Sequence, residues 1–287
     1  MPDSKAIASG DATICAEAFG DAADPPILLI MGQMASMLWW PEAFCRRLAE
    51  AGRFVIRYDN RDTGRSTSYD PGHPGYTTGD FVGDALAVLD GHGIGRAHIV
   101  GMSGGGAVAQ LVTLDHPERA ASVTAISTTA VGGVERGLPG PDPAYLQHAA
   151  SFMDLDWSDR DALVEMIVRE AEALSGTRHP FDEAATRAFV EADLARTANP
   201  PSLVNHTIHS GDDGPERSVR DLAAPLLVIH GSADPLFPLE HGVALAEAVP
   251  GATLVTVEGG GHELHEGDWD QILDAIVAHT RAAPPQA

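Results

Sequence analysis

The sequence predicts an α/β protein, in which a mostly parallel β-sheet is flanked by helices and carries a helical insertion. Up to residue 130 and again after residue 221, short β-rich runs alternate with longer segments of helical periodicity. Between these parts, acidic helix-forming segments are separated by proline and glycine and contain few β-branched runs. We therefore expect a core domain made of residues 1–130 and 222–287, and a helical cap made of residues 131–221.

Three short apolar segments near the N-terminus, residues 12–19, 26–31 and 54–58, are predicted strands. Residues 27–30 are apolar without interruption, as expected of a strand buried on both faces of a parallel sheet. A helix is expected over residues 77–92, because apolar residues recur there near helical spacing.

The same alternation continues on both sides of the insertion. Before it we expect a strand at residues 97–100, a helix at 105–115 and a strand at 122–127. After it we expect strands at 225–229 and 253–257 and helices at 240–248 and 268–279. Because parallel strands end at one edge of a sheet, the loops that follow them should meet there.

Composition excludes several classes of partner. The 287 residues carry a formal net charge of −23, which repels nucleic acid and anionic membranes. No apolar run approaches the roughly 18 residues that cross a bilayer, and the start of the chain lacks the pattern of a secretory signal. We therefore expect a soluble, cytoplasmic protein without a membrane or nucleic-acid partner; a homo-oligomer is compatible with this composition. Cys15 and Cys45 are too few for a disulfide framework and are expected to be core thiols.

A G-x-S-x-G pattern formed by Gly101, Ser103 and Gly105 follows a predicted strand and opens a predicted helix. A serine on such a sharp turn needs small residues two before and two after it, because neighbouring backbone leaves no room for side chains. Five-residue patterns with two glycines also arise by chance in a chain with 30 glycines. The strand and helix on either side favour the nucleophile interpretation of Ser103.

A serine hydroxyl needs a general base, and the base needs a third group to orient it. Asp234 stands just after the strand at 225–229, and His262 follows a run of three glycines after the strand at 253–257. Either segment alone could be an ordinary turn or a solvated loop. Together with Ser103 they occur in the order serine, acid, histidine and all at strand ends, so we expect a Ser103, His262, Asp234 catalytic triad.

His265 is the rival for the role of base, since it lies three residues after His262. The pair also suggests a zinc site. A helical H-E-x-x-H motif, however, places its histidines four residues apart, and this segment has no clear helical pattern. We therefore expect His262 to be the base, and we expect no metal and no cofactor.

An acyl-transfer enzyme must hold the oxyanion with backbone N–H donors. The amide of Gly104, directly after the nucleophile, is the first expected donor, and the amide of Gln33 in the loop after an early strand is the second. Residues 34–40 are rich in methionine and tryptophan beside the expected reacting centre, which indicates an apolar site. We expect Gly32, Met34 and Met102 to contact substrate there. Residues 59–66 are charge-rich, and we expect them to form a structural turn.

These motifs resemble the α/β-hydrolase superfamily over nearly the whole chain, in the serine-nucleophile branch that includes carboxylesterases, lactonases and perhydrolases. More narrowly, Met31-Gly32, the run 55–67 (VIRYDNRDTGRST) and residues 88–90 (VLD) are similar to polyketide methylesterases that act on aclacinomycin-type anthracyclines. The resemblance implies the α/β-hydrolase fold and a helical cap over the pocket. The chain departs from those enzymes at Gly104, where they tend to carry Met, and at Gln33, where they carry Gly.

We expect a carboxylic ester hydrolase that forms an acyl-enzyme intermediate and acts on a fairly apolar small molecule. The alternatives are a perhydrolase, a lactonase or a carbon–carbon hydrolase with the same triad. A non-catalytic ligand receptor on this fold is a further alternative. A receptor could lack triad members, whereas this sequence contains all three.

Overall fold

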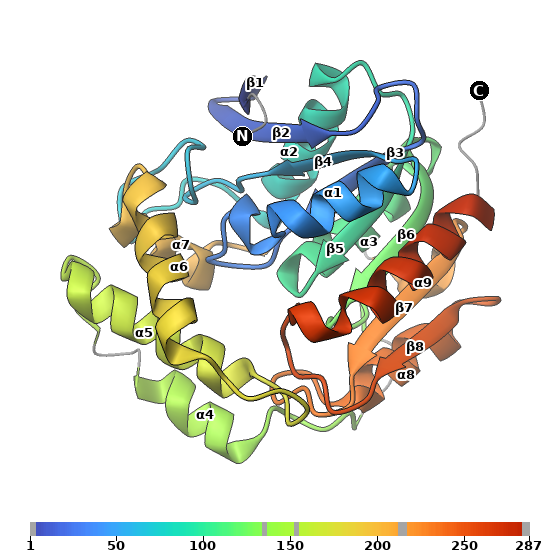
Figure 1. Ribbon diagram of the computed structural model, residues 1–287. Helices are drawn as coiled ribbons and strands as arrows, with labels where there is room; N and C mark the ends of the chain where they lie inside the picture. Colours follow the sequence, from blue (N-terminus) through green and yellow to red (C-terminus); the bar gives the residue numbers. More distant parts are fainter. Residues whose placement is uncertain (1–3, 134–136, 152–154, 212–216, 283–287) are drawn as a thin grey trace.

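A sheet of eight strands forms the centre of the molecule in a computed structural model, which describes residues 4–133, 137–151, 155–211 and 217–282 (Figure 1). The strand order is β1-β2-β4-β3-β5-β6-β7-β8. All neighbours from β4 to β8 pair in parallel, whereas β2 runs antiparallel to both β1 and β4. The strands are β1 Ser4–Ser9, β2 Ala12–Phe19, β3 Pro26–Ile30, β4 Phe54–Tyr58, β5 Ala97–Met102, β6 Ala120–Ile126, β7 Leu226–Gly231 and β8 Thr253–Val257.

Helices cover both faces of the sheet (Figure 1). The alternation along β3 shows how: Leu28 and Ile30 pack into one apolar cluster, and Ile27 and Leu29 into the other. The first cluster includes residues of α2, α3 and α8, and the second includes residues of α1 and α9. These helices are α1 Glu42–Glu50, α2 Thr78–Gly91, α3 Gly104–Asp115, α8 Leu239–Ala248 and α9 Trp269–Ala282.

The inserted helices lie between β6 and β7 in the chain and are α4 Pro143–Ala150, α5 Arg160–Leu174, α6 Glu183–Arg196 and α7 Asn205–Ile208. Residues of α5 and α6 form an apolar cluster of their own, which includes Leu163, Met166 and Leu194. Packing against the main core resumes at Val219, which is fully buried in the first sheet cluster. No helix among the described residues is long and apolar enough to cross a membrane.

The predicted α/β class and the strand and helix alternation are confirmed, and two elements were missed. Strand β1 pairs with β2 through a two-residue hairpin at Gly10 and Asp11, a turn signal that could have revealed it. Helix α1 buries Phe44, Cys45 and Leu48 on one face, which is helical spacing. Both expected core thiols, Cys15 and Cys45, are buried and free.

Candidate active site

Ser103 occupies the turn between β5 and α3 in a strained backbone conformation. Its φ of 54° and ψ of −124° lie outside the regions that L-residues favour. The turn is held on several sides: the Ser103 N–H donates to the Ile126 carbonyl at 2.9 Å, and the Ser103 carbonyl accepts from the Gly106 amide at 2.8 Å. The hydroxyl of Thr128 also donates to that carbonyl at 2.9 Å. The serine is therefore fixed at the carboxyl end of a central strand.

The glycines around Ser103 are required by close backbone contacts. A Cβ at Gly101 would lie 2.0 Å from the Gly105 carbonyl oxygen, and a Cβ at Gly105 would lie 2.2 Å from the Ile30 carbonyl oxygen. Gly32 lies against Ser103 itself, since a Cβ there would be 3.1 Å from Ser103 Cβ. Close backbone contacts thus exclude a side chain at Gly101 and at Gly105, as the motif predicts.

His262 and Asp234 are joined by a buried hydrogen bond. His262 Nδ1 lies 2.8 Å from Asp234 Oδ2, and both side chains are buried. The other oxygen, Oδ1, accepts the backbone amides of Leu236 and Phe237, each at 2.9 Å. The carboxylate is therefore oriented by its own loop, and it in turn orients the imidazole so that Nδ1 carries the proton.

The inserted helices contact the loop that carries His262. The His262 N–H donates to the carbonyl of Leu174, the last residue of α5, at 2.8 Å. Gly176 fits tightly against this loop, because a Cβ there would lie 2.3 Å from the Gly259 carbonyl oxygen and 2.4 Å from the Gly261 nitrogen. The position of the histidine is thus set by both the core and the insertion. Among the described residues, no hydrogen bond joins Ser103 Oγ to His262, a bond that free enzymes often leave long.

Gln33 lies close to Gly104, the residue that follows Ser103. A Cβ built on Gly104 would be 3.5 Å from the Gln33 nitrogen and 3.0 Å from Gln33 Cγ. Residues 31–36, here called the oxyanion loop, follow β3, and the Asn60 side-chain amide donates to the Met31 carbonyl at 3.0 Å. The two residues whose amides are expected to donate to the oxyanion are therefore close to each other.

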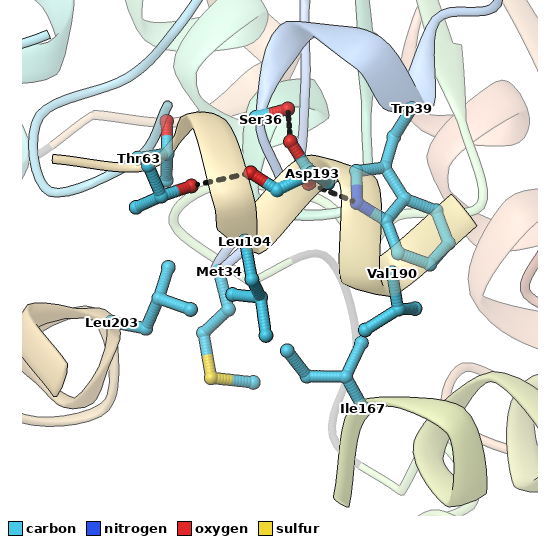
Figure 2. A pocket seen from close by; sticks show the side chains of 10 residues that line it. Met34, Ser36, Trp39, Thr63, Ile167, Val190, Asp193, Leu194 and Leu203 are labelled. Carbon is cyan, nitrogen blue, oxygen red and sulfur yellow. Dashed lines mark hydrogen bonds between the residues drawn. The ribbon is translucent and has the colours of Figure 1, made fainter. Parts of the chain in front are cut away.

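Met34 and Met102 are placed differently from each other. Met34 lines a pocket between the oxyanion loop and the inserted helices, with Trp39, Val190 and Leu203 among its other walls (Figure 2). The free volume of this pocket, ≈ 10 Å³, is about one water position, so a larger group can enter only if side chains move. Ser103 and His262 do not line it. Met102 is buried in the second sheet cluster, where packing accounts for it.

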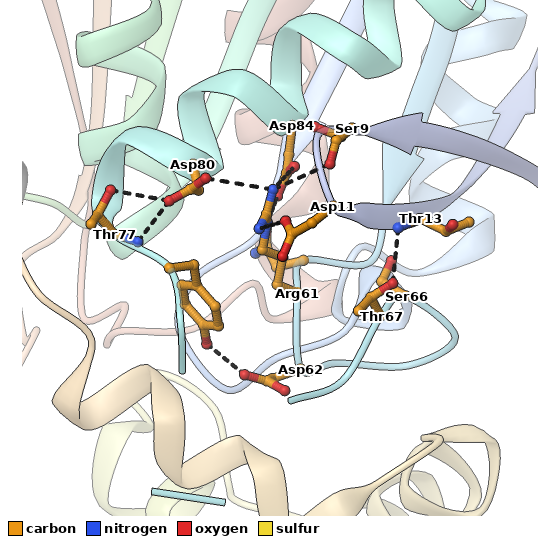
Figure 3. Close-up of polar contacts among 12 residues, drawn as sticks. Ser9, Asp11, Thr13, Arg61, Asp62, Ser66, Thr67, Thr77, Asp80 and Asp84 are labelled. Carbon is orange, nitrogen blue, oxygen red and sulfur yellow. Dashed lines mark hydrogen bonds and ion pairs between the residues drawn. The ribbon is translucent and has the colours of Figure 1, made fainter. Parts of the chain in front are cut away.

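The charge-rich residues 59–66 form a structural turn, as expected. Arg61 is buried and donates to both oxygens of Asp84, at 2.8 and 3.0 Å, and to Asp11 at 3.0 Å (Figure 3). At the start of the turn, Arg196 at the end of α6 makes a bidentate ion pair with buried Asp59, at 2.9 and 2.8 Å. The turn therefore connects the core to the inserted helices.

His265 does not approach Asp234 in the way that His262 does. Its Nδ1 accepts the Gly267 amide at 3.0 Å, and its ring stacks on His179 with centroids 4.0 Å apart and planes inclined by 6°. With Asp268, these two histidines bring three potential metal-ligand atoms within 4.8 Å of one another. The lone pairs of two parallel imidazoles do not converge on one point, and Asp268 Oδ1 already pairs with His179 and Arg178. The contacts of Arg178 and His179 with His265 and Asp268 therefore join the insertion to the core.

Three residues that support the site were missed in the sequence. Thr128 holds the Ser103 carbonyl, Asn60 holds the Met31 carbonyl, and His206 of α7 accepts the Met34 amide at 3.0 Å. Each acts on a partner between 25 and 172 positions away in the chain, so no local pattern identifies them.

The chain is similar to known proteins both in sequence and in fold. The model of the alpha/beta hydrolase fold family matches residues 25–268. The chain is 37% identical to rhodomycin D methylesterase DauP of Streptomyces sp. (strain C5) and 36% identical to rhodomycin D methylesterase DnrP of Streptomyces peucetius, with 99% of each chain covered in both cases. In fold it is similar to the esterase RhEst1 from Rhodococcus sp. ECU1013, with a TM-score of 0.79 at 21% identity over 98% of this chain and 99% of that one. The chain belongs to the alpha/beta hydrolase fold family.

Proposed function

We propose that this protein cleaves carboxylic esters with Ser103 as nucleophile, His262 as general base and Asp234 as the acid that orients the histidine. The observation that carries the proposal is the His262–Asp234 hydrogen bond of 2.8 Å. The two residues lie on loops that follow β8 and β7, and the strained Ser103 turn follows β5 at the same edge of the parallel sheet. The protein is a carboxylic ester hydrolase, as its similarity to two methylesterases over 99% of the chain supports.

The reaction follows the chemistry of an acyl-enzyme. Ser103 Oγ attacks the ester carbonyl carbon while His262 Nε2 takes its proton. The amides of Gln33 and Gly104 donate to the oxygen that becomes negatively charged. His262 then gives the proton to the leaving alcohol, the C–O bond breaks, and water repeats the sequence to release the acid. Asp234 stabilises the imidazolium and keeps the Nδ1–H tautomer.

We propose further that residues 131–221 act as a cap that shapes the substrate site. This is supported by the separate apolar cluster of α5 and α6 and by the apolar wall that Met34 shares with these helices. Gly32 and Met34 are the proposed substrate contacts, because the first adjoins Ser103 and the second faces the cap. Rhodomycin D, which the names of the two methylesterases give as their substrate, is the first methyl ester to test.

The test is a screen of methyl, short-acyl and aryl esters with the purified enzyme and three variants. Ser103→Ala and His262→Ala should each lose about 10⁴-fold or more in kcat on every ester that the wild type cleaves. His265→Ala is the matched control, because His265 lies in the same segment and makes no contact with Asp234. Activity that survives at His262→Ala and disappears at His265→Ala would overturn the assignment of the base.

A further inference from the structure

His206 lies fully within the molecule and bridges two backbone segments of the core. It belongs to α7, the short helix of residues 205–208, and is 2% exposed. The backbone N–H of Met34 donates to His206 Nδ1 at 3.0 Å. The opposite ring nitrogen, Nε2, lies 2.7 Å from the Arg61 carbonyl oxygen.

These two contacts require one protonation state of the imidazole. A carbonyl oxygen can only accept, so Nε2 carries a proton, and Nδ1 must be free of one to accept the Met34 amide. Burial lowers the pKa of His206 to about 4, which keeps the ring neutral at physiological pH. The ring therefore acts as a fixed link, accepting on one side and donating on the other.

The backbone of Met34 is strained and must be held in place by surrounding contacts. Its φ of 58° places a non-glycine residue in the left-handed region, which costs about 1–2 kcal/mol. Strained conformations persist only where surrounding contacts enforce them. The Met34 side chain lies against Leu203 and other apolar residues of the insertion (Figure 2), and its amide is held by His206. This residue directly follows Gln33, whose amide is a proposed oxyanion donor.

The other end of the link is anchored. The Arg61 side chain is locked by Asp84 and Asp11 (Figure 3), so its backbone carbonyl is a rigid acceptor for His206. Asn205, the residue before His206, donates to Asp62 Oδ2 at 2.9 Å. The helix that carries His206 is thus tied to the same turn at two adjacent residues.

We propose that His206 is a positioning residue for the oxyanion hole: by accepting the Met34 N–H it fixes the oxyanion loop so that the Gln33 amide points at the developing charge. The inference rests on the proposed function, because it requires Gln33 and Gly104 to be the oxyanion donors. It assigns to the insertion a part in the chemical step, beyond shaping the substrate pocket.

Two substitutions separate the two hydrogen bonds of the ring. In His206→Gln the side-chain amide can replace Nε2–H and donate to Arg61, but no acceptor remains for Met34. In His206→Asn the side-chain oxygen can replace Nδ1 and accept from Met34. The proposal predicts that His206→Gln lowers kcat by about 10- to 100-fold with KM changed less than about threefold, and that His206→Asn recovers most of that loss. His209→Gln, three residues away and half-buried, is the control and should keep the wild-type kcat.

The affinity of a transition-state analogue is a second measurement, which should not change if His206 only stabilises the fold. The affinity of a trifluoromethyl ketone should fall for His206→Gln in proportion to kcat/KM, since this compound binds through its oxyanion. Nitrogen NMR of the wild-type imidazole should show the neutral Nε2–H tautomer at pH 7, and this measurement does not depend on any variant folding. Equal kcat values for folded His206→Gln and His206→Asn, or a different tautomer, would overturn the proposal.

The failure of this inference can be distinguished from failure of the proposed function by labelling wild-type Ser103 with a fluorophosphonate. If Ser103 is labelled and esters are cleaved while the two His206 variants do not differ, only the role of His206 is wrong. If wild-type protein is neither labelled nor active, the catalytic assignment and the role of His206 are both wrong.

Discussion

His262 Nδ1 lies 2.8 Å from Oδ2 of Asp234, while Oδ1 of the same carboxylate accepts two backbone amides of its own loop. In Asp234→Asn the side-chain oxygen must take those amides, so the NH₂ group faces His262. Nδ1 then becomes an acceptor, the proton moves to Nε2, and the ring can no longer act as a base. We expect kcat to fall about 10³- to 10⁴-fold in steady-state ester hydrolysis.

Asp274→Asn, which removes an exposed carboxylate on α9, is the control for charge and should leave kcat unchanged. The melting temperature of Asp234→Asn should stay within a few degrees of the wild type, since shape and most hydrogen bonds are kept. An Asp234→Asn enzyme with more than a tenth of wild-type kcat would show that another group orients the base.

Two glycine substitutions should change stability in opposite directions. Gly101→Ala would place a Cβ 2.0 Å from the Gly105 carbonyl oxygen, a backbone atom that cannot give way cheaply. We expect it to cost about 3 kcal/mol or more of unfolding free energy. Gly83→Ala lies on the exposed face of α2 with no atom within 4 Å of the new Cβ, and it should add about 1 kcal/mol. Urea unfolding of both variants measures this, and equal effects would contradict the steric argument.

The ion pair between Arg196 and Asp59 should contribute to stability, because its loss would leave the buried Asp59 carboxylate without its charged partner. Asp59 is fully buried, so Arg196→Met leaves a buried carboxylate without its bidentate partner. We expect a loss of about 3–5 kcal/mol in denaturant unfolding. Arg46→Met, which breaks an exposed pair with Glu42, should cost less than about 1 kcal/mol. Similar losses in the two variants would mean that burial of the pair is energetically unimportant.

Stability should decrease as the pH falls from about 6.5 to 4. The pKa of buried His206 is lowered to about 4, whereas an unfolded histidine titrates near 6.5. Within this window the unfolded chain binds the additional proton, so acid favours unfolding, by about 3 kcal/mol in total for this group. The contribution is fully present above pH 6.5 and lost towards pH 4.

The check is the unfolding free energy of the wild type and of His206→Asn, measured at several pH values between 4 and 7. The variant lacks the titrating ring, so its stability should depend less steeply on pH in this window. Identical slopes for the two proteins would contradict the assignment of a neutral His206.

Much of the core could be predicted from the sequence because its signals are local. Strand β4 and strand β8 have the predicted bounds, and the glycines around Ser103 follow from the steric needs of one sharp turn. Helix α1 shows its signal only in the spacing of three buried residues between a tryptophan-rich loop and β4. Such a short amphipathic stretch is easily overlooked beside longer elements.

The contacts between insertion and core could not be predicted in the same way. His206 stands in a four-residue helix without a motif, and its partner Met34 is 172 positions away. The tight fit of Gly176 against the His262 loop depends on two segments meeting backbone to backbone. These relationships arise from tertiary packing, which leaves no periodicity in either segment.

Fluorophosphonate labelling, followed by mass spectrometry of the intact protein and its peptides, tests whether Ser103 is the nucleophile of an esterase. We expect one adduct per chain, located on Ser103, with loss of p-nitrophenyl ester hydrolysis in proportion to labelling and no adduct in Ser103→Ala. Labelling at another residue, or ester hydrolysis that persists in Ser103→Ala, would contradict it.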